Sequence, residues 1–558
     1  MGVYLNPGKT RFQMAVDSAI FVDKTEMISY MNSIINTNQR YVSISRPRRF
    51  GKTMAADMLC AYYDRTADSR SLFENTKLAK CAPIRRGNQE IAWDHYLGQF
   101  DVLRIVLTDF IQRNMSVDDI LDYLTEEVTG ELMAAYPHIS YGSRINLSGV
   151  MKKIFAQTNR AFVIIIDEWD AIFRIRQKDP EGQIRYLDFL REWLKDKDYV
   201  ALAYMTGILP IKKYGEHSAL NMFDEYSMTS PLQLARFTGF TEDEVMELCD
   251  QYGRDYQKIK DWYDGYLVRG VIPPDPGHTR QKETGSSPTS RIYALYSPLS
   301  VVKAVSTGVI QNYWNKTETY EALAEFIRKD YDGLQDAVAL LMDGGRLKID
   351  ISSYQNDMTT FHGRDDVLSL LIHLGYLGYD SETKEVFIPN REILDEFKTS
   401  TKSAEWVSTF KAFERSQKLL RATWEEDAEK VAELLEEAHN RAGNKTYNDE
   451  AALSYAIQYA YYAAQKYYTT ILELDTGKGY ADVIFLPSPK YPELPALLIE
   501  LKYNKDAKTA LTQIRQQKYD ERLEHYKGNL LLVSINYDKE KRNDDPEYKH
   551  HTCIIERA

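Results

Sequence analysis

Three charged residues in the C-terminal part of the chain have the types and spacing of a site that cleaves phosphodiesters. Asp482 interrupts the apolar segment 479–485, and Glu500 and Lys502 lie in a second apolar segment, 497–502. Side chains alternate along a strand, so Glu500 and Lys502 should project from one face. Carboxylates can hold a Mg²⁺ ion that activates water, and a lysine can stabilise the developing charge. We expect catalytic roles for Asp482, Glu500 and Lys502, with Asp482, Glu500 and the carbonyl of Leu501 as metal ligands.

The segments around these two strands supply further candidate residues. Glu450 lies where a long helical stretch begins, and we expect it to add a carboxylate to the metal site. Segment 507–524 is expected to form a helix with interleaved basic and aromatic side chains, which suits a nucleic-acid backbone. Its expected contact residues are Gln513, Arg515, Lys518 and Tyr519. The alternatives are a solvated charged helix and an outward Glu/Lys pair. The order of acid-bearing strand, Glu-x-Lys strand, helix and strand (530–535) favours a restriction-endonuclease-like core.

A second phosphate-handling pattern lies in the N-terminal part of the chain. Gly51, Lys52 and Thr53 match the end of a P-loop, in which backbone N–H groups and the lysine hold phosphates and the hydroxyl binds Mg²⁺. An apolar segment, 41–45, precedes the loop, and a helical segment, 54–63, follows it. Arg46 stands where such loops usually have their first glycine. The expected nucleotide-binding residues are Arg46, Arg48, Arg49, Gly51, Lys52 and Thr53; Arg48 and Arg49 could instead hold the loop by ion pairing.

The partner of this loop is an apolar segment, 162–166, that ends in Asp167 and Glu168. Such a segment suits a buried parallel strand whose C-terminal end carries a site. Asp167 is expected to hold Mg²⁺ through water, and Glu168 to orient the attacking water as a catalytic residue. Thr206 ends the next apolar strand, 200–206, and is expected to sense the γ-phosphate. The alternative for the acidic pair is a cap on the following helix.

The elements that must position these residues indicate an α/β protein. Up to about residue 235, strand-like segments alternate with helical periodicity, which is the pattern of a parallel sheet covered by helices. Segment 102–108 lies between the two nucleotide motifs in sequence. This order fits NTPases that insert a strand between the P-loop strand and the strand of the metal-binding Asp. The expected strands are 41–45, 102–108, 162–166, 200–206 and, more weakly, 223–228.

The middle of the chain has a mainly helical pattern. Thr241 and Glu244 form a capping box at the start of its first helix. Segment 272–290 is rich in Pro, Gly and Ser and is expected to be a mobile loop, and a short strand-like return follows at 385–389. A helical block, 404–439, then opens the last domain. The expected domains are 1–235, 236–404 and 405–558.

Composition limits the classes of protein that remain. A chain of 558 residues with 44% apolar and 27% charged residues is typical of two to four globular domains. The net charge of −12 argues against a protein that coats nucleic acid over its whole surface, although a local basic groove is allowed. The four cysteines are scattered, so neither a disulfide framework nor a zinc site is indicated. No apolar run reaches the roughly 20 residues of a membrane span, and the first residues do not resemble a signal peptide, so we expect a cytoplasmic protein without a membrane partner.

Together these motifs resemble a largely bacterial family that joins a predicted AAA-ATPase-like domain to a PD-(D/E)XK nuclease domain. The resemblance implies a P-loop NTPase (AAA-like) parallel-sheet domain, a helical middle region and a C-terminal restriction-endonuclease-like α/β domain. It also implies that Arg46 in place of the first glycine is normal, whereas Tyr480 departs from relatives that often carry Arg there. The segments that carry it are 21–25, 46–53, 166–170, 206–207, 239–241, 262–266 and 388–390, with Asp482, Glu500, Lys502, Gln513 and Tyr519.

The expected function is therefore that of an ATP-binding and ATP-hydrolysing protein with a metal-dependent nuclease domain. ATP and Mg²⁺, with Mn²⁺ as a substitute, are the expected cofactors. Nucleic acid is the expected partner; DNA is favoured, and the residues leave RNA and strandedness open. The resemblance adds a role in defence against foreign DNA, and AAA-like ATPases often complete their sites in homo-oligomers. The alternatives are a nucleotide-gated protein that binds nucleic acid or a partner without cutting, and a structural ATPase whose middle region binds a protein.

Overall fold

The computed structural model describes residues 2–558 except 88, 144, 215–216, 219, 272–289, 315–332, 402–403, 443–456, 458–459, 476–479, 490, 505–525, 527 and 539–549. The chain divides into two compact units. The first unit consists of Met1–Asp332 and Leu347–Phe397, and the second of Gly333–Arg346 and Lys398–Ala558. The expected mobile loop 272–290 lies outside the described residues except for Ser290. Among the described helices, none has the length and apolar character needed to cross a membrane.

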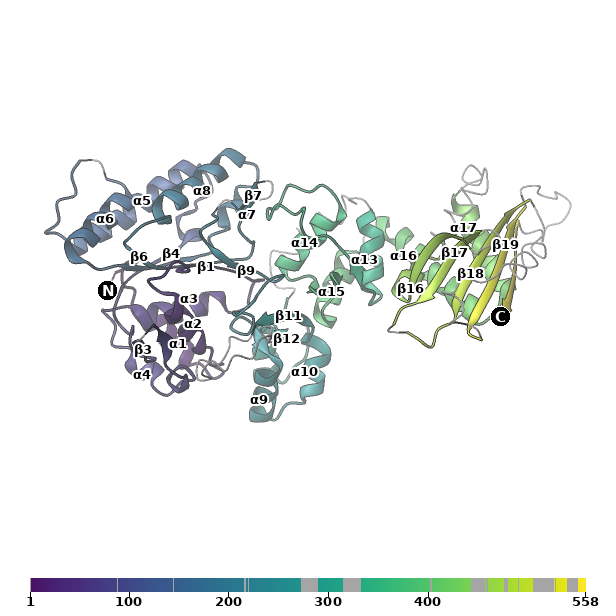
Figure 1. Ribbon diagram of the computed structural model, residues 1–558, viewed down its shortest axis with the longest axis horizontal. Helices are drawn as coiled ribbons and strands as arrows, with labels where there is room; N and C mark the ends of the chain where they lie inside the picture. Colours follow the sequence, from purple (N-terminus) through teal and green to yellow (C-terminus); the bar gives the residue numbers. More distant parts are fainter. Residues whose placement is uncertain are drawn as a thin grey trace. The chain divides into compact units, whose positions relative to one another are not determined.

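A parallel five-stranded sheet is the centre of the first unit. Its strand order is β4 (Asp101–Val106), β5 (Phe162–Asp167), β6 (Val200–Gly207), β1 (Tyr41–Ser45) and β9 (Asp224–Tyr226). Helices α1 to α3 lie on one face, and α5, α6 and α8 on the other (Figure 1). Because both faces are covered, β1, β5 and β6 are buried along their whole length. The helices are α1 (Thr10–Val16), α2 (Glu26–Ile34), α3 (Lys52–Tyr63), α5 (Val117–Ala135), α6 (Leu147–Thr158) and α8 (Pro180–Leu194).

The sheet confirms the expected α/β fold, with two differences in detail. In space, β6 rather than β4 lies between the P-loop strand β1 and β5, while β4 forms the edge beyond β5. The expected strand 102–108 ends at Val106, because the chain turns into a 3₁₀ helix, η2 (Leu107–Phe110), closed by a hydrogen bond from Ile111 N to Thr108 O. The short elements nearby are α4 (Arg70–Phe73), η1 (Leu78–Lys80), β2 (Ile84–Arg86), β3 (Gln89–Ile91), α7 (Ala171–Ile175), β7 (Lys213–Tyr214) and β8 (His217–Ser218).

The middle region begins with the predicted capping box, which the structure confirms. Thr241 Oγ1 accepts a hydrogen bond from Glu244 N, and Glu244 Oε2 accepts one from Thr241 N at 2.8 Å. The region is mostly helical, but it also contains an antiparallel sheet that its pattern did not indicate. Its first described helices are α9 (Glu242–Tyr252), α10 (Tyr256–Tyr263) and α11 (Pro298–Thr307), and the sheet order is β10 (Phe240–Thr241), β12 (Ser290–Tyr296), β11 (Tyr266–Val271).

The last part of the first unit, Leu347–Phe397, contacts both β11 and the segment after β6. Tyr266 of β11 donates a hydrogen bond to Gly375 O at 2.6 Å, and Asn356 Nδ2 donates one to Ile211 O at 2.7 Å. The strand-like return expected at 385–389 is β15 (Glu385–Phe387). The other elements are β13 (Leu347–Lys348), α14 (Arg364–Leu374), β14 (Gly378–Asp380) and α15 (Arg391–Ser400), which continues into the second unit.

A mixed five-stranded sheet is the centre of the second unit. Its order is β16 (Tyr468–Asp475), β17 (Tyr480–Pro487), β18 (Ala496–Tyr503), β19 (Leu530–Tyr537) and β20 (His551–Arg557). Strands β18 and β19 are parallel, and the other neighbours are antiparallel. The helical block expected at 404–439 is two helices, α16 (Ala404–Trp424) and α17 (Ala428–Ala442), because the chain breaks at Glu426 with φ +60°. The remaining elements in the described part of this unit are α13 (Leu334–Met342) and the 3₁₀ helix η5 (Tyr462–Lys466).

Candidate nucleotide and nuclease sites

A pocket of about 730 Å³ in the first unit brings the P-loop and the end of β5 together. Of the expected nucleotide-binding and catalytic residues of this unit, it is lined by Arg48, Arg49, Gly51, Lys52, Thr53, Asp167 and Glu168. The parallel register explains the meeting, because the carboxyl ends of β1 and β5 lie at the same edge of the sheet.

The P-loop owes its curl to two residues with left-handed backbone angles. Arg49 has φ +68° and Gly51 has φ +83°. A Cβ added at Gly51 would meet nothing within 4 Å, so glycine is favoured there by the backbone angle rather than by space. Helix α3 starts at the next residue, Lys52. Backbone N–H groups at such a loop and helix start form an anion-binding end.

Lys52 is buried and donates hydrogen bonds from Nζ to Arg46 O (2.9 Å) and Pro47 O (2.7 Å). Burial lowers its pKa to about 8, although Asp170 and Asp167 attract the charged form. Because both of these hydrogen-bond acceptors are neutral carbonyls, the positive charge of the ammonium group can attract an anionic ligand.

Asp167 is buried beside Thr53, and burial raises the pKa of its carboxyl, although the hydrogen bond with Thr53 and the charge of Arg104 oppose the rise. A hydroxyl and a carboxylate side by side are the hard oxygen ligands that Mg²⁺ prefers, so Thr53 and Asp167 fit this ion. Arg104, on β4, was missed by sequence reasoning; its Nη2 lies 2.9 Å from Asp57 Oδ1 and 3.7 Å from Asp167 Oδ2. The available signal was an arginine inside an apolar strand.

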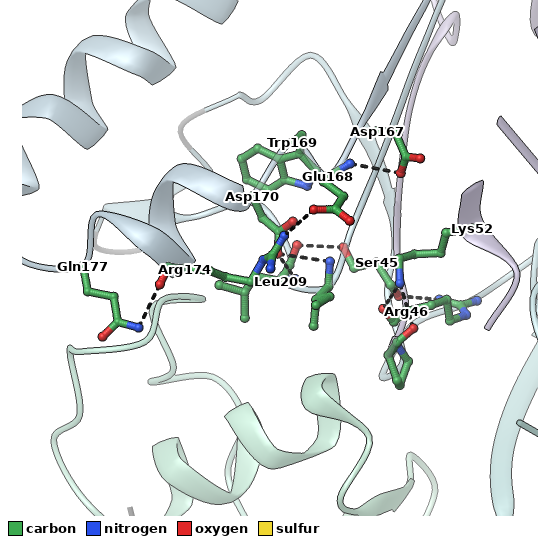
Figure 2. Close-up of polar contacts among 12 residues, drawn as sticks. Ser45, Arg46, Lys52, Asp167, Glu168, Trp169, Asp170, Arg174, Gln177 and Leu209 are labelled. Atoms are coloured by element: carbon green, nitrogen blue, oxygen red, sulfur yellow. Dashed lines mark hydrogen bonds and ion pairs between the residues drawn. The ribbon is translucent and has the colours of Figure 1, made fainter. Parts of the chain in front are cut away.

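Glu168 belongs to an ion-pair network that the sequence did not indicate (Figure 2). Its backbone has φ +54°, a strained angle for a non-glycine residue, and its Oε2 accepts a hydrogen bond from Arg174 Nη2 at 3.1 Å. Arg174 Nε donates to Asp170 Oδ2 at 3.1 Å, and the same oxygen accepts from Ile208 N and Leu209 N. Arg174 also lines the pocket.

Two expected binding residues do not line this pocket. Arg46 is fully buried and donates from Nη1 to Ser45 O (2.8 Å) and Tyr226 O (2.9 Å), so its side chain bridges β1 and β9. Burial lowers its pKa to about 10. Thr206 is buried at the end of β6, where it pairs in register with Asp167. Their roles as phosphate contacts stay predictions.

The rest of the pocket wall is largely apolar and lies outside the two nucleotide motifs, partly in segments 21–25 and 239–241, which carry the family resemblance. Arg49 connects the loop to this side, since its Nη1 donates to Tyr313 O at 2.8 Å. This contact holds the loop through a main-chain carbonyl, and the ion pairing considered from the sequence stays an alternative. The apolar wall residues are Ile20, Phe21, Val22, Phe240, Pro298, Leu299 and Val302.

In the second unit, Glu500 and Lys502 lie on one face of β18, as period-two alternation predicts. Lys502 Nζ donates to Glu500 Oε1 at 2.7 Å, and both side chains are buried. Parallel pairing places Ser534 of β19 beside Glu500 and Asn536 beside Lys502, and these side chains are buried too. The same face is apolar closer to the start of β18, at Ala496 and Leu498. Sequence reasoning missed the polar pair on β19, although both residues interrupt an apolar strand.

Several expected nuclease residues lie outside the description. The backbone at Asp482 belongs to β17, where Val483 lies opposite Ile499 of β18, so the position of Asp482 adjoins that of Glu500. The Asp482 side chain, however, is not described. Glu450, Gln513, Arg515, Lys518 and Tyr519 also lie outside the described residues. Within the described part, the carboxylate of Glu500 is an oxygen ligand that fits Mg²⁺ or Mn²⁺.

Two known proteins show distant similarity to this chain. An uncharacterized protein from the vnfD 5′ region of Azotobacter chroococcum mcd 1 is 25% identical over 319 residues, which are 56% of this chain and 53% of that protein. The chain thus spans about half the length of that curated relative. The Aeropyrum pernix ORC2 protein, solved in ADPNP–ADP complexes, matches 72% of this chain and 96% of that chain, with 11% identity and a TM-score of 0.24. That likeness is too weak to transfer any property.

Family models match two separate parts of the sequence. Residues 9–215, which include the P-loop and the whole Asp167–Arg174 network, match the model described as a predicted AAA-ATPase. Residues 449–547, which include β17, β18 and β19, match the PD-(D/E)XK nuclease superfamily. The chain therefore carries a predicted AAA-ATPase domain followed by a domain of the PD-(D/E)XK nuclease superfamily.

Proposed function

We propose that this protein binds and hydrolyses ATP in its first unit and cleaves nucleic-acid phosphodiesters in its second. The observation that carries the proposal is the pocket in which Lys52 and Thr53 face Asp167 and Glu168. The buried Glu500–Lys502 pair in a family of nucleases supports the second activity. DNA is the favoured substrate, and defence against foreign DNA is the proposed role.

In the nucleotide site, each residue has a distinct task. Lys52 and the backbone N–H groups of the loop bind the phosphates, while Thr53 and Asp167 hold Mg²⁺. This ion, when bound, supplies neutralising charge to the phosphate oxygens. Glu168, whose side chain reaches the pocket, orients the attacking water.

In the nuclease site, Glu500 holds a divalent cation together with Asp482. The cation, when bound, supplies Lewis-acid activation. Lys502 lies within hydrogen-bond distance of Glu500, so its ammonium can stabilise negative charge that develops on the scissile phosphate. Mg²⁺ is the proposed ion, and Mn²⁺ is its substitute.

We also propose that nucleotide binding controls cleavage. The proposed domains are 1–235 for the ATPase, 236–404 for the middle region and 405–558 for the nuclease. A line of contacts supports the control. Arg49 of the P-loop donates to Tyr313 O, and Tyr313 N donates to Glu392 Oε1 at 2.6 Å. Glu392 lies in α15, the helix that continues into the second unit. A change at the loop can therefore alter the packing of the segment that leads to the nuclease domain.

The test is cleavage of labelled duplex DNA, single-stranded DNA and RNA by the purified full chain, with Mg²⁺ or Mn²⁺ and with or without ATP. We expect Lys502→Ala to reduce cleavage by roughly 100-fold or more, since it removes one preorganised charge stabiliser. Lys52→Ala should remove the effect of ATP. Arg185→Ala, which removes an exposed ion pair with Asp118, is the control and should change neither.

Two results would contradict the proposal. Cleavage that is indifferent both to ATP and to Lys52→Ala would exclude nucleotide control. No cleavage of any substrate with either ion and ATP would favour a protein that binds nucleic acid without cutting it.

A further inference from the structure

Arg174 is a charged residue of the nucleotide pocket that has no place in the proposed reaction. It lies in the short helix α7, directly after the segment that carries Asp167 and Glu168. Its side chain is mostly buried, with 13% of its surface exposed, yet it lines the pocket. A guanidinium stays charged and presents its N–H donors in a fixed planar fork. A buried guanidinium at this position therefore fixes the orientation of any carboxylate to which it donates hydrogen bonds.

The fork of Arg174 joins two carboxylates of different character. Nε contacts Asp170, whose side chain is fully buried, and Nη2 contacts Glu168, whose side chain is 41% exposed. Asp170 is anchored by the backbone N–H groups of Ile208 and Leu209, at 3.1 and 3.0 Å. One end of the fork is thus fixed to the loop after β6, and the other end reaches the carboxylate that faces the pocket.

The packing around Asp170 leaves this anchor little freedom. A Cβ added at Gly207 would lie 2.7 Å from Asp170 Oδ1 and 2.8 Å from Trp169 Nε1, so only glycine lets the two segments approach this closely. Trp169 N also donates to Thr206 O at 3.2 Å. Strand β6 therefore holds Asp170, and Asp170 holds Arg174.

Glu168 itself needs such a support. Its left-handed backbone angle turns the residue out of the line of β5, and Glu168 N donates to Asp167 Oδ1 at 3.0 Å. The side chain beyond this turn has several rotatable bonds, and its one hydrogen bond to the described residues is the contact with Arg174. Without that contact, the carboxylate could adopt several directions in a pocket of this size.

We infer that Arg174 is a positioning residue that fixes the Glu168 carboxylate for water attack, through the anchor Asp170–Ile208–Leu209. The inference rests on the proposed ATP hydrolysis and deepens it. Arg174 acts through Glu168, so its loss should lower turnover and leave nucleotide binding to Lys52 and the loop. A merely structural arginine would instead change binding, folding or both.

The experiment compares the full chain with Arg174→Ala, Arg174→Lys, Glu168→Gln and the double variant Glu168→Gln/Arg174→Ala. It measures kcat and KM for ATP hydrolysis and the equilibrium affinity for ATP. Arg174→Ala should lower kcat by roughly 10- to 100-fold, with the affinity changed by less than about threefold. Arg174→Lys keeps one charge without the fork and should have an intermediate kcat. The kcat of the double variant should lie within about twofold of the kcat of Glu168→Gln, because the two residues act as one unit.

Arg185→Ala is the matched control, because Arg185 also pairs with two carboxylates, Asp118 and Glu181, but does not line the pocket. It should keep the original kcat. The inference is overturned if Arg174→Ala keeps kcat within about twofold, or if the losses from Glu168→Gln and Arg174→Ala multiply in the double variant. If Arg174→Ala does not fold, Arg174→Lys and its double variant with Glu168→Gln decide by the same rule. ATP hydrolysis by the unsubstituted protein is measured first. If this protein does not hydrolyse ATP, the proposed hydrolysis and the inference are overturned together.

Discussion

Lys52 in the first unit and Lys502 in the second are both buried, but their ammonium groups have different kinds of partner. Lys52 Nζ donates to two neutral main-chain carbonyls, whereas Lys502 Nζ donates to the carboxylate of Glu500. The first arrangement leaves a positive charge for a ligand. The second places opposite charges side by side, where the lysine can act on a phosphate and the carboxylate can still bind a cation.

The backbone explains the difference. A loop with left-handed residues folds back on itself, so its own carbonyls surround the lysine that starts the following helix. On a strand, residues two apart share a face, so the partner of Lys502 is set by the sequence as Glu500.

Glu392 extends the comparison to a carboxyl group of the first unit. It accepts hydrogen bonds from Tyr313 N, Trp314 N and Ser300 Oγ, which are all neutral donors. Burial raises its pKa to about 7, although these hydrogen bonds oppose the rise. Lys52 and Glu392 of the first unit thus both have neutral hydrogen-bond partners. Burial lowers the pKa of Lys52 and raises that of Glu392, and each shift favours the uncharged form of the side chain.

The strongest challenge to the comparison is to remove one charge of the second unit. Lys502→Met should destabilise the β18–β19 region by about 3 kcal/mol, because it leaves the buried Glu500 carboxylate without its cation. The double variant Glu500→Gln/Lys502→Met should recover much of this loss. Hydrogen exchange of peptides from β18 and β19 in the full chain measures the effect.

The control for this experiment is Lys430→Met, which removes an exposed ion pair with Glu433 in the same unit. It should change exchange by less than about 1 kcal/mol. Equal protection in Lys502→Met and in the unsubstituted protein would show that the ion pair is not the dominant partner of Glu500.

A second challenge uses pH at the nucleotide site. Lys52 is protonated below about pH 8, so ATP affinity should be greatest there and fall as pH rises through and above that value. The decrease should approach tenfold per pH unit above the pKa of the free site, until the pH reaches the higher pKa that bound phosphates give Lys52 in the complex. Titration with a fluorescent ATP analogue from about pH 7 to about pH 9.5 measures it.

Lys52→Arg sharpens the result, because a guanidinium stays protonated over this range. Its affinity, whatever its value, should not change with pH. An affinity of the unsubstituted protein that is constant to about pH 9.5 would mean that the charge of Lys52 is held by more than neutral carbonyls.

The smallest expected effect concerns Glu392. Its pKa is about 7 in the folded chain and near 4.5 without the fold, so the folded state binds more protons between these values. Its contribution to the free energy of unfolding therefore decreases as pH rises from about 4.5 to about 7. Glu392→Gln, which does not titrate, should gain about 1 kcal/mol relative to the unsubstituted protein between about pH 6 and about pH 8.

Thermal unfolding of both proteins at each pH measures this difference, which should appear as a relative rise in Tm for the variant. Glu382→Gln, at an exposed carboxylate paired with Arg269, serves as the control and should show no such rise. A difference between Glu392→Gln and the unsubstituted protein that does not change with pH would contradict the raised pKa.

Much of the fold was predictable because it depends on local patterns. The strands around Val42, Val163 and Ala203 are short apolar runs, and their burial on both faces follows from helices that the periodicity also indicates. The capping box at Thr241 needs only two residues three positions apart. The β11–β12 pair was not predicted, because the Pro-, Gly- and Ser-rich segment 272–290 separates its partners and a connection of that length does not indicate a hairpin.

The sequence by itself determined which chemistry is present: a P-loop lysine and threonine, an Asp–Glu pair after a buried strand, and a Glu-x-Lys on another. Spacing within one element is enough for that, since a strand or helix start sets neighbours over a few residues. Only the tertiary structure decided that Arg46 turns away toward β9, that Ser534 and Asn536 lie beside Glu500 and Lys502, and that Arg174 links Glu168 to Asp170. Such contacts depend on strand order and on which side chains share a buried volume, and local sequence periodicity determines neither of these.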